Sequence, residues 1–149
     1  MQTNPASVVS AGASWQRVDF ISDLHLSERD PVTQARFDAF MQSAAPGADA
    51  LYVIGGWDGK VTRAEVWRAP FLSDGRVGGW TAMPAYPFTF DLHDAAVLNG
   101  WIYVVGGWNG TQAQQTVYAA KVEGSGLGAW QRVSDLPQAL YRLAVASDG

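Results

Sequence analysis

An eight-residue sequence recurs after 51 positions, and this repeat constrains the fold more than any other feature of the chain. Residues 52–59 read YVIGGWDG, and residues 103–110 read YVVGGWNG. Further downstream, the matches at shifts of 51 and 50 are residues 66–69 with 117–120, and Gly79-Trp80 with Ala129-Trp130. Ordered matches in one register are typical of repeat architectures, in which each unit stacks on its neighbours.

Each period has the composition of short strands joined by tight turns. Residues 101–105 (WIYVV) are β-branched and aromatic, with Asn99-Gly100 before them and Gly106-Gly107 after them, a pattern typical of a strand in a hairpin. The other expected strands are residues 94–98, 116–122 and 130–133, of which the last stops before Pro137. The sequence therefore predicts a mainly β fold, with one four-stranded meander in about 50 residues.

Residues 51–149 resemble kelch repeats on the strength of the paired glycines and the spaced tryptophans. The resemblance implies two repeats, 51–100 and 101–149, each forming one four-stranded blade of a β-propeller. A propeller closes with about four to eight blades, so the chain would hold an incomplete one. Glycine permits positive φ and close approach, and large aromatic rings fill the space between sheets, which gives six residues structural roles. These residues are Gly55, Gly56, Gly106, Gly107, Trp80 and Trp130.

The first 50 residues do not follow the repeat. Residues 1–17 read as a tail, and residues 18–26 read as a buried strand that contains Asp23 and His25. Asp30-Pro31 is typical of a helix start, and a helical apolar stripe follows at Phe37, Phe40, Met41 and Ala44. The next expected strand runs from Ala50 to Ile54. A short β-α-β-like segment is therefore expected before the repeats, with residues 18–50 as its own unit.

Residues 20–26 (FISDLHL), the helix and residues 48–55 (ADALYVIG) are similar to the start of UDP-2,3-diacylglucosamine hydrolases, which are calcineurin-like metallophosphoesterases. The resemblance implies that Asp23 and His25 bind a divalent metal, Mn or Zn. In that family the second strand continues Gly-Asp, and the aspartate bridges two metals. Gly56 stands in that place here, and the chain has only one other histidine, His93. Two ligands do not hold a two-metal centre, so we expect no catalytic residues and no cofactor.

A second Asp-x-His sequence, Asp91-Leu92-His93, precedes the expected strand 94–98. A hydrogen-bonded loop histidine is the simpler interpretation of His93, and the alternative is that both Asp-x-His pairs meet on one divalent ion. The two resemblances overlap within residues 51–55, which predicts a chimeric or truncated chain, arising by recombination, assembly error or design.

Composition excludes several classes of partner. The net charge is -4, with 10 Lys and Arg against 14 Asp and Glu, which argues against nucleic acid and anionic membranes. The sequence shows no apolar run near the roughly 18 residues of a membrane span and no signal peptide at its start. It has no cysteine, which excludes disulfides and thiolate sites but leaves the compartment undetermined.

These patterns favour a non-catalytic kelch-type module that binds or scaffolds a protein or other macromolecule, or that self-associates through open blade faces. Propeller ligands usually meet loops at one end, which makes Trp57, Asp58, Trp108 and Asn109 the candidate binding residues. The alternative is a metal-dependent hydrolase of phosphoric esters or anhydrides that uses Asp23 and His25.

Overall fold

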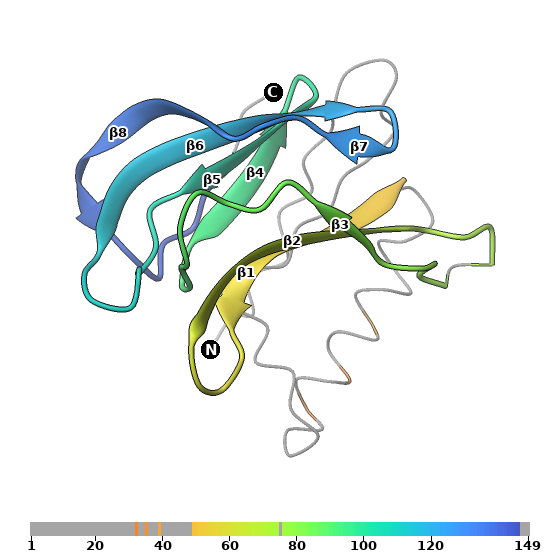
Figure 1. The fold of residues 1–149 in the computed structure, drawn as a ribbon, viewed down its shortest axis with the longest axis horizontal. Helices are drawn as coiled ribbons and strands as arrows, with labels where there is room; N and C mark the ends of the chain where they lie inside the picture. Colours follow the sequence, from red (N-terminus) through yellow and green to blue (C-terminus); the bar gives the residue numbers. More distant parts are fainter. Residues whose placement is uncertain (1–31, 33–34, 36–38, 40–48, 75, 147–149) are drawn as a thin grey trace.

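The computed structural model describes residues 32, 35, 39, 49–74 and 76–146, and these residues form a mainly β structure of two antiparallel sheets (Figure 1). The first sheet has the strand order β1 (Ala50–Trp57), β2 (Thr62–Pro70), β3 (Thr81–Met83). The second sheet contains β4 (Asp94–Leu98), β5 (Trp101–Val105) and β6 (Gln114–Glu123), and β6 also pairs with β7 (Gly126–Leu127) and β8 (Gln131–Leu140).

Several features expected from the sequence lie outside the described residues. These are the tail 1–17, the strand 18–26 with Asp23 and His25, and the apolar stripe of Phe37, Phe40, Met41 and Ala44. The part of the chain that the structure describes contains no helix with the length and apolar character needed to cross a membrane.

The sequence repeat is also a repeat of strand pairing. In the first sheet Val53 lies opposite Trp67, and in the second sheet Val104 lies opposite Tyr118, each residue shifted by 51 positions. The same shift relates every one of the five pairs between β5 and β6 to a pair between β1 and β2. Both sheets therefore have the same register, and equivalent residues face the same side of each sheet.

Several strand boundaries differ from those expected. β6 was expected at residues 116–122 and extends from Gln114 to Glu123. β1 continues through its glycine pair to Trp57, because a bulge between Ile54 and Gly56 absorbs the irregular backbone. β8 was expected to stop before Pro137, but it runs to Leu140. Among the described strands β8 pairs only with β6, and its register shifts in the stretch that contains Pro137. Proline lacks an N–H donor and is tolerated in such a stretch of an edge strand.

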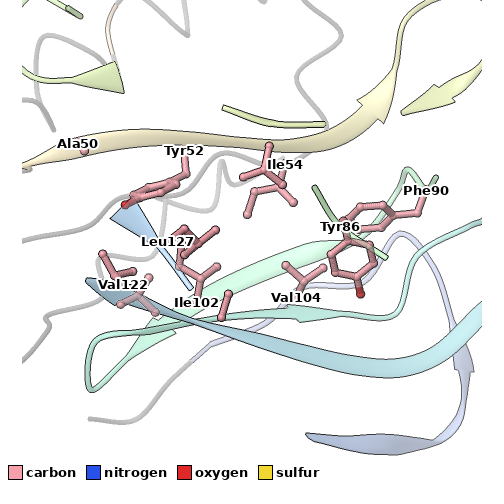
Figure 2. Packing of buried hydrophobic residues seen from close by; sticks show 12 residues of the cluster. Ala50, Tyr52, Ile54, Tyr86, Phe90, Ile102, Val104, Val122 and Leu127 are labelled. Atoms are coloured by element: carbon pink, nitrogen blue, oxygen red, sulfur yellow. The ribbon is translucent and has the colours of Figure 1, made fainter. Parts of the chain in front are cut away.

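The core lies between the two sheets, and Figure 2 shows side chains from both sheets meeting there. Its fully or nearly buried members include Tyr52, Ile54 and Val66 from the first sheet and Ile102, Val104 and Ala120 from the second. Tyr86 and Phe90, from the connection between β3 and β4, stack with ring centroids 4.0 Å apart. Burying an apolar side chain of this size contributes about 1.5–3 kcal/mol, so the contact between the sheets is a main source of stability.

Trp80 and Trp130 occupy equivalent repeat positions but have different environments. Trp130 packs against the core, its indole N–H donates to the Pro84 carbonyl at 3.0 Å, and its ring lies 5.2 Å from that of Tyr86. The expected burial of Trp80 is wrong, since its side chain is 49% exposed. A shift of 50 from Pro84 and Tyr86 leads to Gln34 and Arg36, which belong to the segment before the repeats. Trp80 therefore lacks the repeat equivalents of the residues that cover Trp130.

Candidate functional site at the turns of both sheets

The turn between β1 and β2 is built by one aspartate. The Asp58 carboxylate accepts hydrogen bonds from the backbone N–H groups of Lys60 at 2.8 Å and Val61 at 2.9 Å. The N–H of Asp58 in turn donates to the Val61 carbonyl at 3.2 Å. Gly59, with φ of +95°, supplies the left-handed backbone that closes the turn. The sequence folds this way because Asp hydrogen-bonds readily to the backbone just after it.

The turn between β5 and β6 repeats this geometry with an asparagine. The Asn109 side-chain oxygen accepts from the N–H groups of Thr111 at 3.0 Å and Gln112 at 2.9 Å. The N–H of Asn109 donates to the Gln112 carbonyl at 3.2 Å, and Gly110 has φ of +94°. Asp58 and Asn109, two of the four candidate binding residues, therefore have the same turn-forming role.

The two turns differ in charge. The Arg63 guanidinium forms an ion pair with the Asp58 carboxylate in the first turn. Hydrogen bonds from the backbone N–H groups of Val61 and Lys60 lower the pKa of Asp58, and Arg63 adds to this effect. A shift of 51 from Arg63 leads to Gln114, which donates to the Gln112 carbonyl at 3.0 Å. The first turn therefore presents an ion pair, whereas the second presents neutral amides.

The two candidate tryptophans are also unequal. Trp57 is the last residue of β1, opposite Thr62, and its side chain is 50% exposed. Trp108 is partly buried, and its backbone bridges to both Asp91 and Ala113. The Trp108 ring also lies 5.4 Å from the ring of Tyr141. Trp57 thus offers more open aromatic surface than Trp108.

Both turns lie at the same end of the two sheets. A side-chain carbon placed on Gly110 would lie 3.7 Å from the Thr62 hydroxyl oxygen, so the second turn reaches the first residue of β2. Figure 1 shows the β1–β2 and β5–β6 connections close together at the ends of their strands. We call this surface, formed by Trp57, Asp58, Arg63, Trp108, Asn109 and Tyr141, the turn surface. It brings together all four binding residues expected from the sequence.

His93 is a packing residue. It is 9% exposed, and its ring centroid lies 4.1 Å from that of Phe90. Burial lowers the pKa of His93 to about 4, and the negative charge of Asp94 opposes this shift. His93 lies in the loop just before β4, as expected, and the expected hydrogen bond is not made by Nδ1, which is buried and has no partner among the described residues. A side-chain carbon on Gly107 would lie 2.9 Å from the His93 Cβ, so the chain at His93 passes directly against Gly107.

The described residues do not fit a two-metal centre. They contain no group of three or more His, Cys, Asp or Glu side chains that could hold a metal ion. Gly56, at the place where the hydrolase pattern has its bridging aspartate, has φ of +104° and no side chain to offer. Asp23 and His25 lie outside the described residues.

Comparison with known proteins supports one of the two resemblances. A 36-residue segment is similar to UDP-2,3-diacylglucosamine hydrolases. It is 58% identical to the enzyme of Haemophilus influenzae, 53% to that of Coxiella burnetii and 56% to that of Aromatoleum aromaticum. The segment covers 24% of this chain and 15% of each of these relatives. No protein-family model matches the chain.

A metallophosphoesterase-like segment is therefore supported by similarity, whereas the kelch resemblance has no support from these comparisons. Arg63 and Tyr141 are the turn-surface residues that sequence reasoning missed. Arg63 could have been recognised from the sequence, because it is a charged residue at the repeat position that Gln114 occupies in the second copy. Tyr141 could not have been recognised from the sequence, since its contact with Trp108 joins two separate parts of the chain.

Proposed function

We propose that residues 51–149 are two units of a kelch-type β-propeller and act as a non-catalytic binding or scaffold module. Support comes from the common register of the two sheets, with Val53 opposite Trp67 and Val104 opposite Tyr118. Further support comes from the face-to-face packing of the sheets, which is how propeller blades are arranged.

The observation that carries this proposal is the turn surface. Repeat folds bind partners through loops gathered on one side, and here two turns of the same geometry lie next to each other. The surface offers the exposed rings of Trp57 and Tyr141 beside the ion pair of Asp58 with Arg63. Aromatic residues and arginine are enriched where proteins bind other proteins. We therefore propose a protein segment as the partner.

Selection of displayed peptides on the purified full chain tests this proposal. Peptides that bind the turn surface should lose about 30-fold in affinity for Trp57→Ala, the loss of a hot-spot aromatic residue of about 2 kcal/mol. Trp80→Ala is the matched control, because Trp80 is equally exposed. It directly precedes β3, which pairs with residues 66–68 of β2 and not with Thr62 at the turn surface. Enriched peptides that bind Trp57→Ala as tightly as the wild type, or a selection without enrichment, would contradict the proposal.

The second candidate is a metal-dependent phosphoesterase, favoured by the 36-residue similarity to UDP-2,3-diacylglucosamine hydrolases. In this case Asp23 and His25 would bind Mn or Zn. Because Gly56 replaces the bridging aspartate, we expect no release of product from UDP-2,3-diacylglucosamine in Mn²⁺ above the rate in buffer. Stoichiometric Mn²⁺ or Zn²⁺ binding by calorimetry, abolished in both Asp23→Ala and His25→Ala, would favour the enzyme instead.

A further inference from the structure

Each sheet has one face in the core and one face that points away from it. The core faces contain Tyr52, Ile54 and Val66 in the first sheet and Ile102, Val104 and Ala120 in the second (Figure 2). Alternation along the strands places the intervening residues on the opposite faces. On the first sheet this opposite face, the Val53 face, consists of Leu51, Val53, Trp67 and Ala69. On the second sheet the Tyr103 face consists of Trp101, Tyr103, Val105, Val117 and Ala119, with Lys121 opposite Trp101 at its end.

The sheets pack head to tail, so different repeat faces meet in the core. Shifting the Val53 face by 51 residues gives Ile102, Val104, Tyr118 and Ala120, which form the core face of the second sheet. The Tyr103 face is the shifted form of the first sheet's core face: Tyr103 corresponds to Tyr52, Val105 to Ile54 and Val117 to Val66. Each outward face therefore repeats a face that already forms half of a packed interface.

The central pair of the Val53 face is exposed where its repeat equivalent is covered. Val53 is 43% exposed, whereas Val104 at the same repeat position is 0% exposed. Trp67, opposite Val53, is 41% exposed, whereas Tyr118 packs against the core. The side chains are alike, so the difference comes from the first sheet that lies on Val104. On the Tyr103 face, Trp101, Tyr103 and Val117 also remain partly exposed. The other apolar members of the two faces are already buried within one copy, namely Leu51, Ala69, Val105 and Ala119.

We propose that a second copy of this chain covers the Val53 face with its own Tyr103 face. The contact between copies would then repeat the contact between the two sheets of one copy. Such a contact joins different surfaces of identical chains, and it closes into a ring when the rotation between units permits. If each copy contributes the two sheets that the described residues form, a closed ring of four to eight sheets takes two to four copies. This inference rests on the repeated register and does not require the turn surface to bind a peptide.

Size exclusion with light scattering on the full chain provides the first test. We expect the wild type at micromolar concentration to have a mass that is a small multiple of 16.0 kDa. Val53→Lys and Tyr103→Lys should each weaken association at least about 100-fold, because an unpaired ammonium would be buried in an apolar contact. Val61→Lys is the matched control: Val61 is exposed like Val53, but lies in the β1–β2 turn. This variant should assemble as the wild type does.

Mixing the two variants tests the head-to-tail arrangement. Val53→Lys retains an intact Tyr103 face, and Tyr103→Lys retains an intact Val53 face. Each variant alone should be monomeric, and an equimolar mixture should form a dimer through the one intact pair of faces. No larger species should form, because both remaining faces carry a lysine.

Three outcomes would overturn the proposal. A monomeric wild type would show that the Val53 face has no second copy on it, and coverage by residues 1–48 of the same chain would give this result. A variant that dimerises alone would show that like faces meet. A mixture that stays monomeric would show that the two faces do not fit each other. Circular dichroism establishes folding of each variant, and Val53→Ala with Tyr103→Ala replaces the lysine pair if either one unfolds.

Discussion

At the scale of single residues, the first glycine of each pair is required for two separate reasons. Gly55 has φ of +57° and Gly106 has φ of +60°, in the left-handed region that L side chains rarely adopt. A side-chain carbon on Gly55 would also lie 2.6 Å from the Phe90 ring, and one on Gly106 would lie 2.6 Å from the Leu140 carbonyl oxygen. Gly124 has φ of +59° but open space around it, so only its backbone conformation, and not a close contact, favours glycine there.

Gly124→Ala and Gly55→Ala separate these two requirements. We expect Gly124→Ala to lower the free energy of unfolding by about 1–2 kcal/mol, the cost of a left-handed alanine. Gly55→Ala should cost about 1–3 kcal/mol more, since its methyl group overpacks the core against the buried ring of Phe90. Urea denaturation of both variants measures the difference. Equal losses would show that the Phe90 ring moves aside freely.

His93 makes stability depend on pH. Its pKa is lowered from 6.5 to about 4 by burial, so the unfolded chain binds a proton in a range where the folded chain does not. The contribution of His93 to the free energy of unfolding is therefore fully present above about pH 6.5. It is lost as the pH falls from 6.5 to 4, by about 3 kcal/mol in total. Urea denaturation across this range measures the loss. In His93→Leu this contribution should disappear, and an unchanged slope would assign the pH dependence to other groups.

Trp130 and Trp80 provide a comparison of one residue type in two environments. Trp130→Ala should lower the free energy of unfolding by about 2–4 kcal/mol, because it removes core contacts and a hydrogen bond to Pro84. Trp80→Ala should change it by less than about 0.5 kcal/mol, as is usual at exposed positions. Thermal unfolding followed by circular dichroism checks both values. A large loss for Trp80→Ala would contradict its exposure.

At the scale of elements, the β4–β5 hairpin depends on its two-residue turn. Asn99 has φ of +50° and Gly100 has φ of +78°, the left-handed pair that a tight antiparallel hairpin favours. Asn99→Val should cost about 1–2 kcal/mol, because a β-branched residue tolerates positive φ poorly. Asn99→Gly should be nearly neutral. Similar stabilities for the valine and glycine variants, measured in urea, would contradict this role of the turn.

The sequence predicts some strand boundaries well because turn residues mark them. β4 and β5 have the expected bounds, since Asn99-Gly100 separates them and a glycine pair follows. β7, in contrast, lies between the expected strands 116–122 and 130–133 and was not predicted, because two residues give no periodic pattern. The extent of β8 was missed because a proline ends a strand only where its N–H is needed for pairing.

The candidate site was predictable in part for a similar reason. The Trp-Asp-Gly and Trp-Asn-Gly sequences indicate turns, and the structure places them at one end of the sheets. The unequal exposure of Trp57 and Trp108 was not predictable, because Asp91 and Tyr141 reach Trp108 from other parts of the chain. Such contacts depend on how the sheets are stacked, and a local pattern carries no information about them.

At the scale of the whole molecule, we expect the two sheets to unfold together. The core cluster draws its members from both sheets, so separating the sheets exposes apolar surface on each. Tryptophan fluorescence and far-UV circular dichroism should therefore give coincident transitions in urea at a fixed protein concentration. Two separated transitions would show that one sheet holds its structure without the other.

The head-to-tail packing of the sheets has a consequence for how such a gene changes in length. Because each sheet carries one face of each kind, a tandem duplication of 51 codons adds a sheet that already matches both of its neighbours. No side chain in the existing interface has to be replaced. A duplication that slips the strand pairing by a single residue would turn every inward side chain outward. Growth in whole units therefore preserves the core, and other steps do not.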